Sequence, residues 1–226
     1  MKFPHAAKGV KKIFLSEIIE LIGSILMFAA GGFAYWLKFT DTTADADLSA
    51  AFATQSVPII IMFCLIITGV VITVIAAIIG LIGIINASRD SMFFKIALFS
   101  VIICVAANIS GLFFPAGSFM SNLMNILYYV FNFSVTLEII QGIIILAEKL
   151  GNQAVAAKGK TTLKVIFAII ILSLLSSVAY SFFPFANANL FIGLGLIGLT
   201  LVLSVIQYFL YLSLLAKAKK MLARSK

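Results

Sequence analysis

The sequence predicts an all-α polytopic membrane protein with six transmembrane helices, arranged as three hairpins, and with both termini in the cytoplasm. The first observation is composition: 63% of the 226 residues are hydrophobic and 11% are charged, whereas a soluble domain is about half apolar and a quarter charged. The second is length, because continuous apolar runs of about 20 residues are what a spanning helix needs. The third is the placement of the basic residues.

Fifteen of the sixteen basic residues lie in the N-terminal segment, in residues 86–95, in residues 148–164 and in the C-terminal tail, and Lys38 is the remaining one. The positive-inside rule places these four segments in the cytoplasm. An even number of spans is needed to bring both basic termini to one side, so the span count and the charge pattern agree. We therefore interpret the net charge of +8 as a topology signal and expect no nucleic-acid partner.

The chain is predicted to form a single transmembrane domain over residues 1–226. The predicted spans cover residues 13–38, 57–85, 93–114, 122–147, 163–183 and 190–216. The first span has a basic start like a signal peptide, but its apolar stretch is too long for one, so we expect it to be retained. Trp36 near its outer end is typical of the aromatic belt. An acidic connection, residues 39–56, leads to the second span, where Pro58 in the first turn costs little because that N–H has no helical partner.

The remaining spans follow in two closely connected pairs. An uncharged link joins the third span to the fourth, and another joins the fifth to the sixth. Between the pairs, residues 148–164 are expected to form a basic loop, with Gly151 stopping the fourth helix. A basic tail follows residue 216.

The two pairs resemble each other in sequence. Lys95 is followed by Phe113-Phe114-Pro115, and Lys164, 69 residues later, is followed at the same spacing by Phe182-Phe183-Pro184. This pattern predicts that residues 93–147 and 163–216 are copies of one hairpin, with residues 13–85 a looser copy. The alternative is that apolar runs rich in Ile, Leu and Phe resemble one another by composition alone.

In its hairpin spacing, and with Pro115 and Pro184 near the outer turns, the chain resembles the HdeD-type acid-resistance membrane proteins over residues 93–216. The resemblance implies three consecutive hairpins and a membrane stress role without a defined catalytic site. The acidic loop at residues 39–56 departs from that pattern.

Glu138 is the main candidate for a functional side chain. It lies about ten residues, or roughly 15 Å of helix, from the cytoplasmic end of its span. An acidic residue at that depth costs roughly 3 kcal/mol, so it should face protein or water. Ser134 and Gln141 share its helical stripe. Because no Lys or Arg lies at matching depth, we expect Glu138 to be protonated, hydrogen-bonded to Gln or Asn, or paired with a bound cation.

Further polar residues complete the predicted ligand- or ion-binding set. Asn132 lies on the opposite stripe of the same span, so the fourth span is expected to be surrounded by other spans. Gln207 aligns with Gln141 in the hairpin repeat, and Asn108 lies within the third span. The functional interpretation is a proton or cation relay or a ligand-binding group. The structural interpretation is a set of hydrogen bonds that hold the helices together.

The sequence lacks the motifs of the common catalytic sites. The one histidine, His5, lies in the N-terminal segment, and neither GxSxG nor a P-loop occurs. The GxGxxG pattern at Gly193, Gly195 and Gly198 follows no strand, so it indicates close helix packing rather than a nucleotide site. We therefore expect no enzyme, no catalytic residue, no metal site and no cofactor.

These observations favour a small transport or ligand-binding membrane component with a polar site around Glu138. One alternative is a non-catalytic membrane stress-response or scaffold protein. A second is a substrate-binding subunit of a larger transporter complex. The expected partners are the lipid bilayer and either further copies of this chain or transporter subunits. Fourteen lysines against two arginines, with abundant isoleucine, are typical of an AT-rich bacterial genome, so we expect the chain in the plasma membrane of a bacterium, its cytoplasmic membrane.

Overall fold

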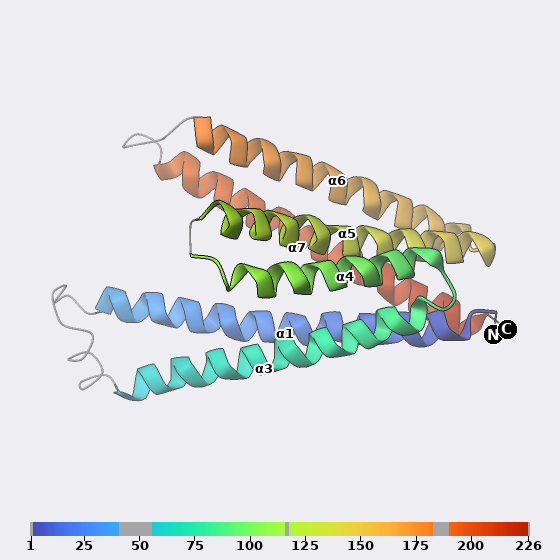
Figure 1. Ribbon diagram of the computed structural model, residues 1–226, viewed down its shortest axis with the longest axis horizontal. Helices are drawn as coiled ribbons and strands as arrows, with labels where there is room; N and C mark the ends of the chain where they lie inside the picture. The colour runs from blue at the N-terminus through green and yellow to red at the C-terminus, as the bar shows by residue number, and fades with distance from the viewer. Residues whose placement is uncertain (1, 41–55, 116–117, 183–189, 226) are drawn as a thin grey trace. The chain divides into compact units, whose positions relative to one another are not determined.

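The computed structural model describes residues 2–40, 56–115, 118–182 and 190–225, and within these ranges all regular secondary structure is helical. The helices are α1 (Pro4–Thr40), α3 (Ser56–Ala87), α4 (Met92–Gly111), α5 (Phe119–Lys149), α6 (Gln153–Phe182) and α7 (Leu190–Arg224) (Figure 1). Five of them, α1, α3, α4, α5 and α7, are long and apolar enough in their described residues to cross a membrane. The all-α membrane fold is thus confirmed, while the sixth span and the side of the termini stay predictions. The acidic residues of the predicted outer loop and Phe183-Pro184 lie outside the described residues.

The chain divides into two compact units. Residues Lys12–Ile82 form the hairpin unit, and Met1–Lys11 together with Gly83–Lys226 form the four-helix unit. Within the hairpin unit, α1 and α3 approach closely at small residues: a Cβ on Gly23 would lie 2.7 Å from Thr73 Oγ1, and one on Gly80 would lie 3.0 Å from Ser16 Oγ. Such small residues allow helix backbones to approach in a membrane.

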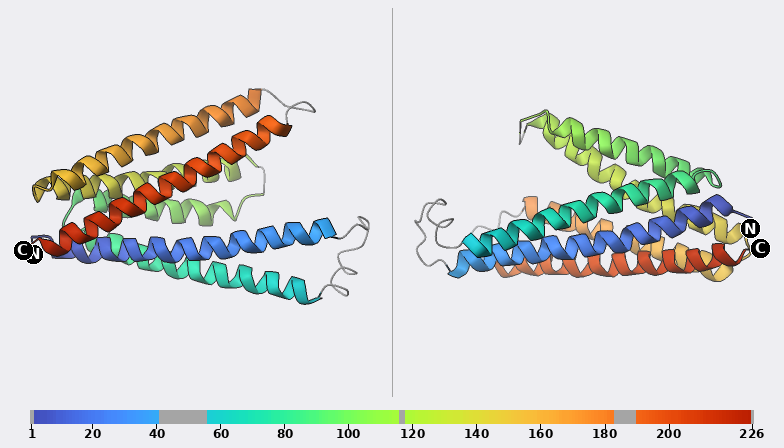
Figure 2. Two further views of the ribbon diagram at one scale, coloured as in Figure 1. Left: turned by 180° about the vertical axis from the view of Figure 1, so that it is seen from behind. Right: turned by 90° about the horizontal axis from the view of Figure 1, so that it is seen from below.

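The four-helix unit is built from α4 to α7 in chain order. Helix α4 packs against α5, α5 against α6, and α6 against α7, and α5 also contacts α7 (Figure 2). Helix α5 therefore touches each of the other three. The hairpins α4–α5 and α6–α7 coincide with the two segments predicted to be repeats, and their common ancestry stays a prediction.

The buried side chains described for α5 and α7 lie toward the end that holds both termini. The buried residues of α5 all lie between Ile139 and Ala147, and the buried residues described for α7 lie between Tyr211 and Leu222. On other faces of the helices, large apolar side chains such as Phe99, 63% exposed, are uncovered, as expected for helices whose surroundings are lipid. The buried residues described for α5 and α7 therefore lie toward the basic end.

A tight turn at that end joins α5 to α6. Gly151 adopts a left-handed φ of 69°, its N–H donates to Glu148 O at 3.0 Å, and the N–H of Asn152 donates to Ala147 O at 2.8 Å. These two bonds make a Schellman motif, as the glycine predicted. Asn152 then caps the next helix, because its Oδ1 accepts from the N–H of Val155 at 3.1 Å.

The predicted loop at residues 148–164 is wrong, because α6 begins at Gln153. The cap at Asn152 starts the helix early, and the alanines and lysines that follow are good helix formers. The early turns also pack on α5: a Cβ on Gly159 would lie 2.5 Å from Ile144 Cγ1, and Lys160 Nζ lies 2.7 Å from Glu148 Oε1. Sequence polarity suggested a loop, but tertiary contacts favour a helix.

The C-terminal ends of α7 and α4 also differ from the prediction. Helix α7 continues through the predicted tail to Arg224. Ala218, Met221 and Leu222 are buried there, and their burial stabilises the helical conformation. Helix α4 ends at Gly111, so the Phe-Phe-Pro segment lies in the turn beyond it. There the N–H of Phe113 donates to Ser110 O at 3.1 Å and that of Phe114 to Gly111 O at 3.4 Å.

Candidate functional site

A hydrogen bond between two spans places Glu138 of α5 against Ser100 of α4. The Ser100 hydroxyl lies 3.2 Å from Oε1 and 3.1 Å from Oε2 of Glu138. Ser100 is only 2% exposed, whereas Glu138 is partly exposed. The pair therefore combines a fully packed donor with an acceptor that remains open on one side.

Helix α4 presents Ser100 to α5 as part of a regular stripe. Its buried residues are Phe94, Ala97, Ser100, Cys104 and Ala107. Spacings of three and four residues place them on one helical face. This face contacts α5 at both ends of the stripe: the Phe94 ring covers Gly142, and Cys104 Sγ donates to Tyr128 O at 3.6 Å. The serine hydroxyl is thus held by the packing on either side of it.

Helix α5 places Glu138 at a boundary. The buried segment of this helix begins one residue later, at Ile139, and residues 119–138 are partly or fully exposed in the four-helix unit. On α5, Glu138 is therefore the residue next to the start of the buried segment. A partly exposed carboxylate at this position can bind a ligand that reaches it from outside the buried segment.

The carboxylate retains unused acceptor capacity. A serine hydroxyl donates a single hydrogen, whereas a carboxylate offers about four lone-pair positions. Ser100 is the one side chain among the described residues that donates to it. Glu138 can therefore accept further hydrogen bonds or ligate a cation without losing its bond to α4.

The other predicted site residues are spread over three helices. Gln141 and Ser134 flank Glu138 on α5 and are partly exposed, as is Gln207 on α7. Asn108 on α4 and Asn132 on α5 are exposed. Within the described part of the chain, none of these five side chains forms a hydrogen bond to another of them. The structure joins Glu138 to Ser100 and not to the amides that the sequence suggested.

Sequence reasoning missed Ser100, although a signal for it exists. Ser100 lies about 12 Å along α4 from its start, and Glu138 lies about 16 Å from the end of α5, at 1.5 Å per residue. Matching polar residues by depth across an antiparallel hairpin would have paired them. The helical stripe of Glu138 and the alignment of the two hairpins pointed to Gln and Asn residues instead.

Among the described residues, no group of three or more His, Cys, Asp and Glu side chains lies close enough to hold a metal ion. No protein-family model, no curated protein and no solved structure matches this chain. The resemblance to HdeD-type proteins stays a prediction, and function has to be argued from the chemistry of the chain itself.

Proposed function

We propose that this membrane-embedded chain is a small transport or ligand-binding component whose polar site is the Ser100–Glu138 pair. The observation that supports the proposal is a carboxylate within a spanning helix that accepts from a hydroxyl of the neighbouring helix, is partly exposed and lies next to the buried segment of its own helix. An acidic group at membrane depth is costly and is retained most often where it meets a proton, a cation or a ligand. The ligand class that fits is a proton, a monovalent cation or an ammonium group.

Purified protein in proteoliposomes tests the proposal. An entrapped pH dye reports proton flux under a potassium diffusion potential, and parallel samples with sodium or potassium outside report coupling to those cations. Glu138→Gln keeps the shape and the bond from Ser100 but removes the charge, so we expect flux to fall at least about tenfold. Glu148→Gln is the matched control, because Glu148 is an exposed carboxylate near the end of the same helix.

Chemical labelling supplies a second readout. Dicyclohexylcarbodiimide, an apolar reagent, modifies carboxyl groups at membrane depth, and mass mapping locates the adduct. We expect a Glu138 adduct whose formation is slowed by the cation that couples to flux. Equal flux in the wild-type protein and Glu138→Gln, with labelling that no cation slows, would overturn the proposal.

The rival function is a non-catalytic stress or scaffold protein, in which Glu138 serves only to join α4 to α5. The 2% exposure of Ser100 favours it, because a fully packed donor suits a structural hydrogen bond. In that case Glu138→Gln leaves all flux unchanged, and Ser100→Ala lowers the free energy of unfolding without changing the flux. Flux and stability measured on the same two variants separate the two functions.

A further inference from the structure

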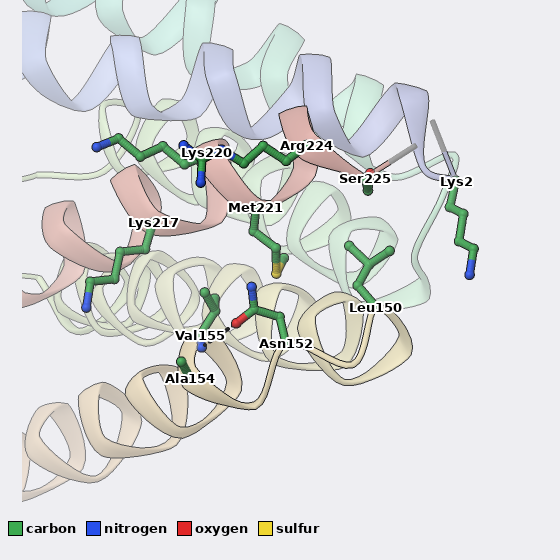
Figure 3. Close-up of a pocket in the computed structure, with 10 residues that line it drawn as sticks. All are labelled: Lys2, Leu150, Asn152, Ala154, Val155, Lys217, Lys220, Met221, Arg224 and Ser225. Carbon is green, nitrogen blue, oxygen red and sulfur yellow. Dashed lines mark hydrogen bonds between the residues drawn. The ribbon is translucent and has the colours of Figure 1, made fainter.

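A cleft at the basic end of the four-helix unit has the composition of an anion site. It measures about 740 Å³ and lies where the two termini meet the α5–α6 turn (Figure 3). Its lining, here named the basic cleft, consists of Lys2, Leu150, Asn152, Ala154, Val155, Lys217, Lys220, Met221, Arg224 and Ser225. Four of these side chains are cationic, and the described lining includes no Asp or Glu.

Three of the cations form a row along α7. Lys217, Lys220 and Arg224 are separated by three and four residues, so they share one helical face, over about 10 Å of helix length. Figure 3 shows them in succession along α7, with Lys2 at the opposite end of the basic cleft. A row of this kind suits an extended anionic group better than a single small ion held at one point.

The floor of the basic cleft is apolar and carries one directed donor. Leu150, Val155 and Met221 contribute apolar surface between α6 and α7. Asn152 uses Oδ1 to cap α6, which leaves its amide N–H groups as donors, and Figure 3 shows this nitrogen pointing toward α7. The first turn of α6 adds the partial positive charge of a helix N-terminus.

Two acidic residues of the four-helix unit have other partners. Glu148 pairs with Lys160, with 2.7 Å between Oε1 and Nζ, and Asp90 Oδ2 accepts from the N–H of Ala6 at 2.7 Å. The positive charge also acts on Lys158, whose ammonium donates a hydrogen bond to the Ser213 hydroxyl. Burial lowers the pKa of the Lys158 ammonium, and the charge of Lys217 lowers it further. Among the described residues, no Asp or Glu lines the basic cleft, so a bound anion can neutralise its cations.

We propose that the basic cleft binds the headgroup of an anionic phospholipid. The phosphate lies along Lys217, Lys220 and Arg224, and the glycerol and first acyl carbons lie on the apolar floor. Basic pockets between helix ends at the cytoplasmic surface are where such lipids bind, because that leaflet carries anionic lipid. A free phosphate ion would satisfy the cations but would leave the apolar floor uncovered.

Native mass spectrometry of the full-length, delipidated protein in detergent tests the proposal. Phosphatidylglycerol is titrated against phosphatidylcholine with the same acyl chains, and inorganic phosphate is titrated alone by calorimetry. The test variant is Lys217→Gln/Lys220→Gln. The matched control is Lys95→Gln/Lys164→Gln, which removes the same charge from exposed lysines outside the basic cleft. Thermal unfolding of both variants checks that they fold.

We expect the wild-type protein to retain phosphatidylglycerol over phosphatidylcholine. The cleft variant should weaken phosphatidylglycerol binding about tenfold, since each interfacial cation contributes severalfold in affinity. The control should change it less than twofold. Equal weakening by both variants would assign the effect to overall charge and overturn the proposal. So would equal retention of the two lipids, or inorganic phosphate that binds as tightly as the lipid and displaces it.

Discussion

Phe94 Cε2 lies 2.6 Å from the position that a Cβ would occupy on Gly142. The Phe94 ring is fully buried, so it cannot swing away to make room for a larger residue. This contact sets the register of α4 against α5. The same register brings the Ser100 hydroxyl, about two turns farther along α4, to the carboxylate of Glu138.

Replacing Gly142 with Ala should therefore loosen the α4–α5 pair. Overpacking a filled core costs about 1–3 kcal/mol, and we expect a lower midpoint of thermal unfolding in detergent. Gly198→Ala is the control, because nothing lies within 4 Å of a Cβ at Gly198, and its effect should stay below about 1 kcal/mol. Among the described residues, none makes the close packing contact that was predicted for this glycine of the GxGxxG pattern. Equal effects of the two substitutions would contradict the packing argument.

The Ser100–Glu138 bond should appear as a coupling energy. A double-mutant cycle with Ser100→Ala and Glu138→Leu, read by unfolding in detergent, compares each single variant with the pair. Hydrogen bonds between membrane helices average about 0.6 kcal/mol and reach about 1.7 kcal/mol, and we expect a value in that range. The same cycle with Gln141→Leu in place of Glu138→Leu should give a coupling near zero, since Gln141 has no hydrogen bond to Ser100 in the described structure.

The left-handed conformation of Gly151, with φ of 69°, should make the α5–α6 turn sensitive to substitution. Ala at this position should cost about 1–2 kcal/mol, because its Cβ meets the following carbonyl oxygen. Asn, which tolerates this conformation, should cost less. The N–H groups of Gly151 and Asn152 close the turn, so faster hydrogen exchange at positions 151 and 152 would show that the substitution has opened it. If Asn were as harmful as Ala, the strain argument would be wrong.

The titration of Lys158 should depend on Lys217. The pKa of Lys158 is lowered from its ordinary value of 10.5 by burial and by the charge of Lys217. In Lys217→Gln the second cause is absent, so we expect the pKa of Lys158 to rise, as measured by NMR of ¹³C-dimethylated lysines. Lys219→Gln removes a charge two residues along α7 from Lys217, and it should move the pKa of Lys158 less.

The sign of the pH dependence follows from the same shift. Between the folded and the unfolded pKa of Lys158, the unfolded chain binds more protons, so stability rises with pH in that window. At pH values below the pKa that Lys158 has in the folded protein, its ammonium is charged and its full destabilising effect on the fold is present. The rise should be smaller in Lys217→Gln, which unfolding measurements at alkaline pH can check.

Much of the architecture follows from the sequence because the bilayer leaves few choices. Backbone polar groups in hydrocarbon must bond within their own segment, so long apolar runs become helices. The second span was predicted at residues 57–85, and α3 runs from Ser56 to Ala87. Gly151 was predicted to end a helix, and it does, because glycine adopts the left-handed conformation without steric cost.

The basic end could not be predicted in the same way. Residues 153–162 have the polarity of a loop, yet they are helical because Asn152 caps them and Gly159 lets α6 approach Ile144. These contacts join residues from different helices, and no local pattern contains them.

The sequence by itself determined an all-helical membrane chain and singled out Glu138, because hydropathy and the cost of a charge at membrane depth are local properties. Tertiary structure alone decided that Glu138 meets Ser100 and not the amides of Gln141 or Gln207. It also brought Lys2 to one cleft with Lys217 and Arg224. Side chains far apart in the chain meet only once packing, such as that of Phe94 on Gly142, has set the register between helices.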